Sequence, residues 1–305
     1  MLTVTVPDED IHSRLADLAD RVRLIRWDLA APLPDEDAAA VEMVVIPHYF
    51  VRPGGFDVLH TLPNLRVVQL PSAGFEHATP HVPPGVTVCN GRGVHSSGTA
   101  ELAVALTLAM QRGLVASVHA MAQGRWHNPM LASLADRRVL VVGAGSVADA
   151  VVARLLPFEV EVTVVGRTAR EGVRGVEELP ALVADADVVI LTVPLDRTTD
   201  HLVDAELLAR MKDGALLVNV ARGKVVDTDA LLAELESGRL RAALDVTDPE
   251  PLPADHPLWR APNVLITAHQ GGNSDATYPR IAALVRRQLE RLLAGDEPLN
   301  VVAHT

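Results

Sequence analysis

The stretch that decides the fold runs from Arg138 to Arg170 and reads RVLVVGAGSVADAVVARLLPFEVEVTVVGRTAR. Its first apolar run, 139–142, leads into Gly143-Ala144-Gly145, and a helical pattern of apolar residues then precedes a second apolar run at 160–165. This order predicts a strand, a glycine turn, a helix and a second strand, which together make one βαβ unit.

The glycines of this turn have distinct physical roles. Gly143 permits a tight turn that a Cβ would strain, and Gly145 lets the backbone approach a pyrophosphate, whose charge is met by the free amides at the helix N-terminus. Ala148 stands at the third position of the G-x-G-x-x-G/A pattern, where a small residue lets helix and strand pack closely. We therefore predict a dinucleotide site at this turn; the alternative is a purely structural turn.

The composition excludes several classes of protein. With 305 residues the chain is long enough for two domains, and 49% hydrophobic with 22% charged residues is typical of a globular protein. A net charge of −12 without a basic cluster argues against nucleic acid or an anionic membrane as the main partner. Cys89 is the only cysteine and the N-terminus lacks the pattern of a signal peptide, so we expect a cytoplasmic protein.

The rest of the chain alternates short apolar runs with helical patterns, which predicts a parallel α/β fold. Strands are expected at 2–6, 22–26, 41–46, 65–70 and 86–88, and six more from residue 139 onward. One long helix is expected over 99–122, capped by Thr99 and buried between domains or subunits. A final helix is expected over 275–293, followed by a tail from Pro298 to Thr305.

The segment from Pro71 to Gly74 directly follows the fourth predicted strand. Loops at the carboxyl ends of parallel strands are where open α/β sheets bind ligands. The small side chains of Ser72, Ala73 and Gly74 leave backbone amides within reach of an anion. The alternative is a simple turn.

Three polar residues, Arg222, Glu250 and His269, each come shortly after a buried apolar run, so they can meet at one edge of a parallel sheet. Together they form the minimal set for reducing a 2-keto acid. The arginine fixes the carboxylate and polarises the carbonyl, the histidine transfers the proton, and the glutamate orients the imidazole. Singly, each has a simpler interpretation as a solvated loop charge or a hydrogen-bonded histidine. The remaining histidines lack metal-ligand spacing, so we predict no metal.

The sequence resembles the D-isomer-specific 2-hydroxyacid dehydrogenase family. The motifs that carry the resemblance are PSAG at 71–74, NGRGVHSSGTAELA at 90–103, VGAGSVA at 142–148, NVARG at 219–223, LDVTDPEPLP at 244–253 and NVLITAHQGG at 263–272. The resemblance implies two Rossmann-like or flavodoxin-like domains with parallel sheets. A dinucleotide-binding domain, 98–274, is inserted into a discontinuous substrate domain made of 1–97 and 275–305. It also implies a homodimer built around the helix at 99–122.

The resemblance assigns roles residue by residue. Arg222 is the substrate-binding arginine, His269 the acid/base and Glu250 its partner, while the amides of Ala73 and Gly74, beside Ser72, bind the substrate carboxylate. Asp245 matches the aspartate that contacts the nicotinamide carboxamide. The full set of expected cofactor contacts is Gly143, Ala144, Gly145, Ser146, Val147, Arg167, Thr168, Arg170, Val193, Pro194, Thr199, Val220, Ala221, Asp245, His269 and Gly271. Two positions differ from relatives of the family. Ala268 replaces the proline that usually precedes the histidine, and Glu250 stands where the family's formate enzymes carry glutamine.

The choice of cofactor depends on the end of the second strand of the βαβ unit. The acidic residue that would bind the ribose hydroxyls aligns with Gly166, and Arg167, Thr168 and Arg170 follow. With no carboxylate to repel it and two guanidiniums close by, a 2′-phosphate is accepted, which predicts NADPH over NADH. A charge-assisted hydrogen bond of roughly 1.5–3 kcal/mol corresponds to about ten- to a hundredfold in affinity. The alternative is that the arginines are merely solvated and NAD is also used.

These observations favour an NADPH-dependent reductase of small 2-keto acids, such as glyoxylate, hydroxypyruvate or phenylpyruvate, that gives D-2-hydroxy acids. The alternative from another class is a cofactor-sensing binding protein that keeps the fold without turnover, as corepressors of the family do. A third hypothesis is an oxidiser of an unusual acid. The sequence leaves the substrate side chain open.

Overall fold

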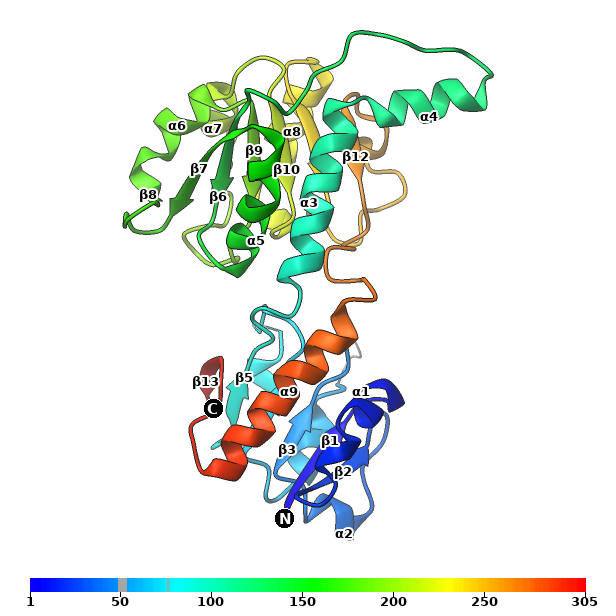
Figure 1. Ribbon diagram of the computed structural model, residues 1–305, viewed down its shortest axis with the longest axis vertical. Coiled ribbons are helices and arrows are strands. Elements are labelled where there is room, and N and C mark those ends of the chain that lie inside the picture. The colour runs from blue at the N-terminus through cyan, green and yellow to red at the C-terminus, as the bar shows by residue number, and fades with distance from the viewer. Residues whose placement is uncertain (49–53, 76) are drawn as a thin grey trace. The chain divides into compact units, whose positions relative to one another are not determined.

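The computed structural model describes residues 1–48, 54–75 and 77–305. The chain forms two compact units, which we call unit 1 (residues 1–95 and 275–305) and unit 2 (residues 96–274). Unit 1 is therefore built from both ends of the chain, coloured blue to cyan and orange to red in Figure 1, and unit 2 from the segment inserted between them. Each unit has its own mostly parallel sheet, so the predicted α/β class is confirmed.

The described residues of unit 1 form a six-stranded sheet with the order β13-β5-β4-β3-β1-β2. Its strands are β1 (Leu2–Val6), β2 (Val22–Arg26), β3 (Met43–Val45), β4 (Val67–Gln69), β5 (Thr87–Cys89) and β13 (Val301–His304), and its helices are α1 (Glu9–Arg14), α2 (Asp35–Ala38) and α9 (Thr277–Ala294). All neighbours pair in parallel except β13, which is antiparallel to β5.

The two faces of this sheet bury different sets of side chains, because successive residues of a strand point to opposite faces. Met43 and Val45 pack in one cluster with α1 and α9, whereas Val44 packs in the other, beside Trp27 and Leu59. α9 ends at Gly295, whose φ of 77° lies in the left-handed region that glycine tolerates.

Residues 96–274, all of which the structure describes, contain a seven-stranded parallel sheet with the order β12-β11-β10-β9-β6-β7-β8. Its strands are β6 (Arg138–Val142), β7 (Glu161–Gly166), β8 (Arg174–Gly175), β9 (Val188–Leu191), β10 (Leu216–Asn219), β11 (Arg241–Leu244) and β12 (Val264–Ile266). The helices are α3 (Ser96–Gln111), α4 (Leu114–Ala122), α5 (Ser146–Leu155), α6 (Leu179–Asp185), α7 (Ala205–Arg210) and α8 (Thr228–Glu236). The strand order reverses where β6 meets β9, which is the point at which doubly wound sheets bind their ligands.

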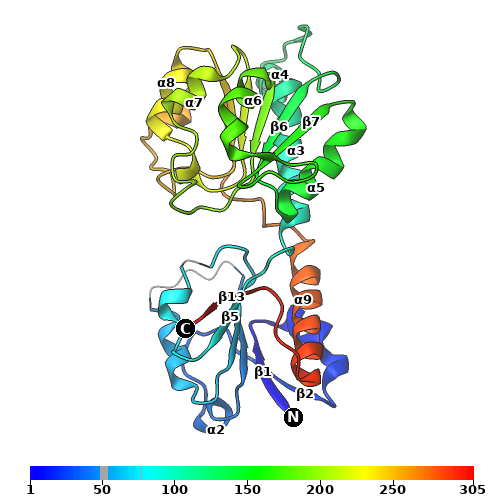
Figure 2. The same cartoon turned by 90° about the vertical axis from the view of Figure 1, so that its left-hand side faces the viewer.

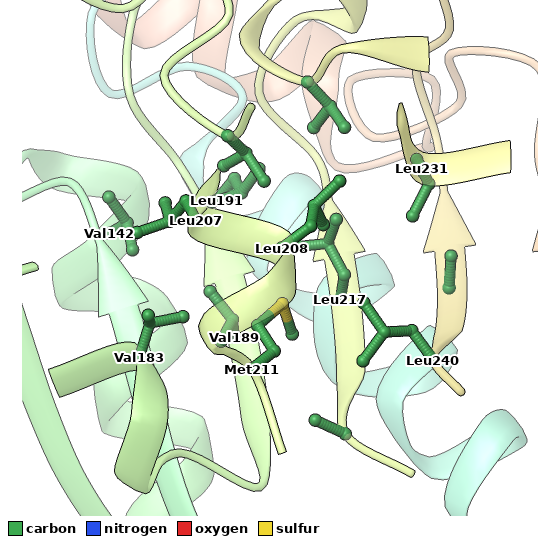
Figure 3. Close-up of a cluster of buried hydrophobic side chains, with 14 of the residues drawn as sticks. Val142, Val183, Val189, Leu191, Leu207, Leu208, Met211, Leu217, Leu231 and Leu240 are labelled. Atoms are coloured by element: carbon green, nitrogen blue, oxygen red, sulfur yellow. The ribbon is translucent and has the colours of Figure 1, made fainter. Parts of the chain in front are cut away.

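Helices cover both faces of this sheet, α3 and α5 on one side and α6, α7 and α8 on the other (Figure 2). Val139 and Val141 of β6 pack toward α3 and α5, while Leu140 and Val142 join the opposite cluster. Figure 3 shows that second cluster, in which Leu207 and Leu208 of α7 lie against the strands. Strands buried on both faces explain the nearly continuous apolar runs of the sequence.

The single long helix predicted over 99–122 is wrong. The chain forms α3 and α4, bent by 64° at a break that contains Gly113, whose φ is 58°. Thr99 is not a cap, because α3 already begins at Ser96. Within the described part of the chain no single helix is long and apolar enough to cross a membrane, and the bent α3–α4 pair reaches that length and composition only when both helices are counted.

Two further expectations need correction. The tail predicted from Pro298 to Thr305 contains β13, whose Ala303 and His304 pair with Val88 and Thr87 of β5. Six strands were expected from residue 139 onward, and the fully described segment 139–274 has a seventh, β8, which joins β7 through only two residue pairs. Both omitted strands are short and lie at sheet edges, β8 with only two residues and β13 with four.

Candidate active site

The glycine turn lies at the carboxyl end of β6, at the point where the strand order of unit 2 reverses. Gly143 has a φ of 120°, and a Cβ there would lie 2.3 Å from Oγ1 of Thr192, the residue that follows β9. At Gly145, by contrast, a Cβ would meet none of the atoms the structure describes within 4 Å. Ala148 is buried against the sheet under α5. The turn therefore leaves room for a phosphate group in front of the first amides of α5.

The arginines after β7 lie beside this turn. Nη2 of Arg170 donates a hydrogen bond of 3.0 Å to the carbonyl of Ala144, inside the glycine turn. Arg167 forms an ion pair with Asp196, and two hydrogen bonds from Thr198 together with Arg167 keep the pKa of Asp196 below its usual range. Both guanidiniums thus lie at the carboxyl edge of the sheet, but Arg167 already has an anionic partner that the sequence did not indicate.

The loop after β9 carries three other predicted cofactor residues, Val193, Pro194 and Thr199. The hydroxyl of Thr199 is buried and donates to the carbonyl of Pro194 at 2.7 Å, and it accepts from the amide of Asp196 at 2.8 Å. Thr199 therefore closes the loop on itself, so its structural role is to fix the backbone of Pro194.

Several predicted cofactor residues have side chains that are packed into the unit 2 core. Val220 and Ala221 are buried after β10, and Val147 packs against the α5 side of the sheet. The side chains of Val220 and Ala221 therefore belong to the core, whereas that of Val147 is half-buried. Ser146 begins α5, and its hydroxyl accepts a hydrogen bond from Ser96 at 2.9 Å. Thr168 is exposed in the turn after β7.

Arg222 is held by the turn that follows β10. Nδ2 of Asn219 donates to the carbonyl of Arg222 at 3.0 Å, and Oδ1 of the same side chain accepts from the backbone amide of Ala221 at 3.0 Å. A Cβ at Gly223 would lie 1.9 Å from the carbonyl oxygen of Thr247, so this turn contacts the loop after β11 directly through backbone. Asn219 was not singled out from the sequence, although it stands in the NVARG motif.

Asp245, at the end of β11, organises the loop that contains His269. Its buried carboxylate accepts hydrogen bonds from the hydroxyl of Thr267 at 2.6 Å and from the amides of Gln270 at 2.7 Å and Gly271 at 2.9 Å. The amide of His269 donates to the carbonyl of Asp245 at 2.7 Å. His269 itself has a φ of 49°, a left-handed conformation that is unusual for a side-chain-bearing residue and that these bonds hold in place.

Of the three residues expected to meet, His269 and Glu250 are in contact within unit 2, and Arg222 acts on Glu250 through its charge. Nδ1 of His269 lies 2.6 Å from Oε1 of Glu250, and both side chains are more than a third exposed. Burial raises the pKa of the Glu250 carboxyl. The hydrogen bond and charge of His269, the backbone amide of Thr247 and the charge of Arg222 lower it more, so the pKa of Glu250 lies below its ordinary value of 4.5.

In unit 1, the loop 71–74 after β4 has all four of its carbonyls engaged. The carbonyl of Pro71 accepts from Nε2 of His95 at 3.1 Å, and that of Ser72 from the amide of Gly91 at 2.6 Å. The carbonyl of Ala73 accepts from Nδ2 of Asn90 at 2.7 Å, and that of Gly74 from the hydroxyl of Ser72 at 2.7 Å. Within residues 1–48, 54–75 and 77–305, the amides of Ala73 and Gly74 donate to no protein acceptor. This pattern is typical of an anion-binding loop.

No group of three or more histidine, cysteine, aspartate or glutamate side chains that could hold a metal ion occurs among the described residues.

The sheet order of unit 2, its glycine turn and the groups at its carboxyl edge define a dinucleotide-binding protein of the doubly wound class. The family model for the D-isomer specific 2-hydroxyacid dehydrogenase NAD-binding domain matches residues 104–271. A glyoxylate reductase from Thermofilum pendens is 34% identical over 259 residues, which cover 79% of this chain and 76% of that protein.

Solved structures agree with these matches. A D-isomer specific 2-hydroxyacid dehydrogenase from Xanthobacter autotrophicus, solved in complex with NADPH and MES, aligns with a TM-score of 0.82 and 30% identity over 99% of this chain and 98% of that one. An NADPH-dependent glyoxylate/hydroxypyruvate reductase from Sinorhizobium meliloti aligns with a TM-score of 0.81 and 27% identity over 100% of this chain and 99% of that one. The chain belongs to the D-isomer specific 2-hydroxyacid dehydrogenase family, and it is an oxidoreductase.

Proposed function

We propose that this protein reduces small 2-keto acids of the glyoxylate, hydroxypyruvate or phenylpyruvate type to D-2-hydroxy acids, with NADPH as the reductant. The observation that carries the proposal is the 2.6 Å contact between His269 and Glu250, with the charge of Arg222 also acting on that glutamate. An imidazole held by an ionised carboxylate is the arrangement that keeps a proton available for transfer to a carbonyl oxygen.

The residues of unit 2 have separate tasks in this scheme. Because Glu250 is ionised at neutral pH, it accepts a hydrogen bond from Nδ1 of His269 and orients the ring, and the proton for the substrate oxygen comes from Nε2. Arg222 binds the substrate carboxylate and polarises the carbonyl. In the described part of the chain its guanidinium donates only to the carbonyl of Ala221, so further N–H groups remain for the substrate. The nicotinamide, when bound, supplies the hydride.

The loop of unit 1 has a complementary task. The amides of Ala73 and Gly74 bind the carboxylate of the substrate, since their carbonyls are engaged and the amides are not. Unit 1 is then the substrate domain and unit 2 the cofactor domain. Backbone amides recognise the carboxylate that all 2-keto acids share, and they do not select its side chain.

The preference for NADPH is supported by the place of the two arginines. Arg170 is fixed over the glycine turn by its bond to Ala144, and Arg167 follows β7 directly. Gly166 lacks the carboxylate that would repel a 2′-phosphate. The phosphate would compete with Asp196 for Arg167, so Arg170 is the stronger contributor of the two.

We further propose that the protein is a homodimer assembled through α4 and the segment 123–131 after it. Apolar side chains there are strongly exposed, among them Met121 at 73%, Trp126 at 96% and Met130 at 99%. Large exposed apolar groups in one segment are typical of an interface between subunits.

A cytoplasmic setting is also proposed, because the only cysteine, Cys89, is buried and forms no disulfide. Recovery of the native protein from a membrane or secreted fraction would contradict this proposal.

A panel of 2-keto acids with NADPH and NADH tests the function. We expect loss of nicotinamide absorbance with at least one acid, faster with NADPH. Where the product is chiral, as with hydroxypyruvate or phenylpyruvate, chiral chromatography should show the D-hydroxy acid. Tight NADPH binding without turnover on any acid would instead favour a cofactor-sensing binding protein.

A further inference from the structure

Asn90, at the start of the loop after β5, holds the loop 71–74 through its side chain. Its Nδ2 donates to the carbonyl of Ala73 at 2.7 Å, and its Oδ1 accepts from the amide of Arg92 at 3.2 Å. The side chain is therefore occupied at both ends and has one orientation. Only 8% of Asn90 is exposed, so water does not replace these bonds.

Two buried glutamines hold Asn90 in turn. Nε2 of Gln69 donates to the carbonyl of Asn90 at 3.0 Å and to that of Leu70 at 2.8 Å. Oε1 of Gln69 accepts from Nε2 of Gln288 on α9 at 2.7 Å, and Gln288 also exchanges hydrogen bonds with the backbone of Leu299 at 2.7 and 2.9 Å. We call Gln288, Gln69 and Asn90 the amide chain.

The amide chain is an unusual way to fill a core. Gln69 and Gln288 are 1% and 0% exposed, and apolar clusters lie on both faces of the unit 1 sheet. Burying an amide is unfavourable unless its hydrogen bonds are made, and an apolar side chain would fill the same volume without that requirement. What directional bonds add is a fixed position for the backbone groups they contact.

The geometry of the peptide unit links this position to the substrate. In a trans peptide the carbonyl of one residue and the amide of the next point in opposite directions. When Asn90 holds the carbonyl of Ala73, it therefore also aims the amide of Gly74 away from the core. The bond from Gly91 to the carbonyl of Ser72 aims the amide of Ala73 in the same manner.

We propose that Asn90, supported by Gln69 and Gln288, is a positioning residue for the substrate carboxylate. It acts through the loop 71–74, and its effect is to preorganise the amides of Ala73 and Gly74 for an anion. This inference rests on the proposed reduction of 2-keto acids.

The test compares Asn90→Ala with Asn64→Ala. Nδ2 of Asn64 also donates to a backbone carbonyl of unit 1, that of Ala39, at the same distance of 2.7 Å, but on an exposed surface. Asn90→Ala should raise KM for the 2-keto acid about tenfold, the cost of a misaligned bond to a charged group. kcat and KM for NADPH should change less than about twofold, because the proton donor and the cofactor turn belong to unit 2 and the substitution alters a loop of unit 1. Asn64→Ala should leave all three constants unchanged.

A purely structural role for Asn90 would lower the melting temperature without changing KM, and that result would overturn the proposal. If Asn90→Ala does not fold, Gln288→Leu replaces it in the test, because this substitution keeps Asn90 and exchanges only its support for an apolar side chain. An increased KM for the 2-keto acid in Gln288→Leu supports the proposal, and an unchanged KM overturns it. Absence of turnover in the unmodified protein contradicts the proposed function, whereas turnover with an unchanged KM in the variants contradicts only this inference.

Discussion

Nδ1 of His269 and Oε1 of Glu250 lie 2.6 Å apart at the carboxyl edge of the unit 2 sheet. Different strands supply them, since Glu250 follows β11 and His269 follows β12. The carboxylate of Asp245 and the backbone contact at Gly223 hold the neighbouring turns, so the pair has a fixed geometry. A carboxylate in this place orients the imidazole of His269 through the hydrogen bond to Nδ1.

Replacing Glu250 with glutamine should slow reduction. The substitution keeps the size of the side chain but removes the charge that lies 2.6 Å from Nδ1 of His269, so the imidazole is no longer held by an ionised carboxylate. kcat/KM for the 2-keto acid should fall about tenfold, the cost of one charge-assisted hydrogen bond, while KM for NADPH should change little. Steady-state kinetics measure both constants. Glu236→Gln, a change in an exposed carboxylate at the end of α8, is the control, and an unchanged kcat/KM in Glu250→Gln would contradict the role of the pair.

The same carboxylate should stabilise the fold in a defined pH range. Because the pKa of Glu250 is lowered in the folded protein, its contribution is present above the ordinary value of 4.5 and is lost as pH falls through the lowered value. The difference in melting temperature between the unmodified protein and Glu250→Gln should therefore have its full size above pH 4.5 and shrink as pH is lowered below that value. A difference that stays constant over this range would show that the charge is not responsible.

Asp245 should matter for turnover because it shapes the loop of His269. Asp245→Asn exchanges one acceptor oxygen for an N–H group that faces backbone amides, so kcat should fall more than about tenfold and the melting temperature should drop. Thr267→Val removes a single hydrogen bond to Asp245 and should have a smaller effect. If Asp245→Asn and Thr267→Val lowered kcat equally, the hydrogen bonds from the backbone amides of Gln270 and Gly271 to Asp245 would not be what holds the loop of His269.

The sequence predicted the parts of this site that depend on local geometry. Gly143 and Ala148 could be assigned because a tight turn and close helix packing restrict the residue type within one βαβ unit. The break at Gly113 was missed although Gln111, Arg112 and Gly113 interrupt the apolar pattern there, because a single short interruption also occurs within continuous helices. Contacts between distant segments had no signal in the sequence. Asp196 meets Arg167 from 29 residues away, and Gln288 meets Gln69 from 219 residues away.

Cofactor preference should depend on Arg170 more than on Arg167. Arg170→Gln should lower kcat/KM for NADPH about tenfold and leave the value for NADH unchanged, because only the 2′-phosphate is affected. Arg167→Gln should also lower kcat/KM for NADPH, but by less, since Asp196 already neutralises the charge of Arg167. Arg174→Gln is the control, because Arg174 pairs with Glu178 in the same exposed segment. Parallel losses with both cofactors would contradict a phosphate contact.

The exposed apolar segment after α4 should control the oligomeric state. Trp126→Ser combined with Met130→Ser should convert a dimer into a monomer in light scattering, because their burial in an interface would be lost. Val176→Ser, at an exposed apolar position elsewhere in unit 2, should leave the dimer intact. A monomeric unmodified protein would exclude the proposed assembly.

The most direct test of the central claim is the turnover of 2-keto acids by the unmodified protein and by His269→Gln under saturating NADPH. We predict that the unmodified protein oxidises NADPH in the presence of at least one of glyoxylate, hydroxypyruvate and phenylpyruvate. His269→Gln should bind NADPH equally well and turn over about 10²–10⁴-fold more slowly, the usual contribution of a general acid. Near-normal turnover in His269→Gln would contradict the claim.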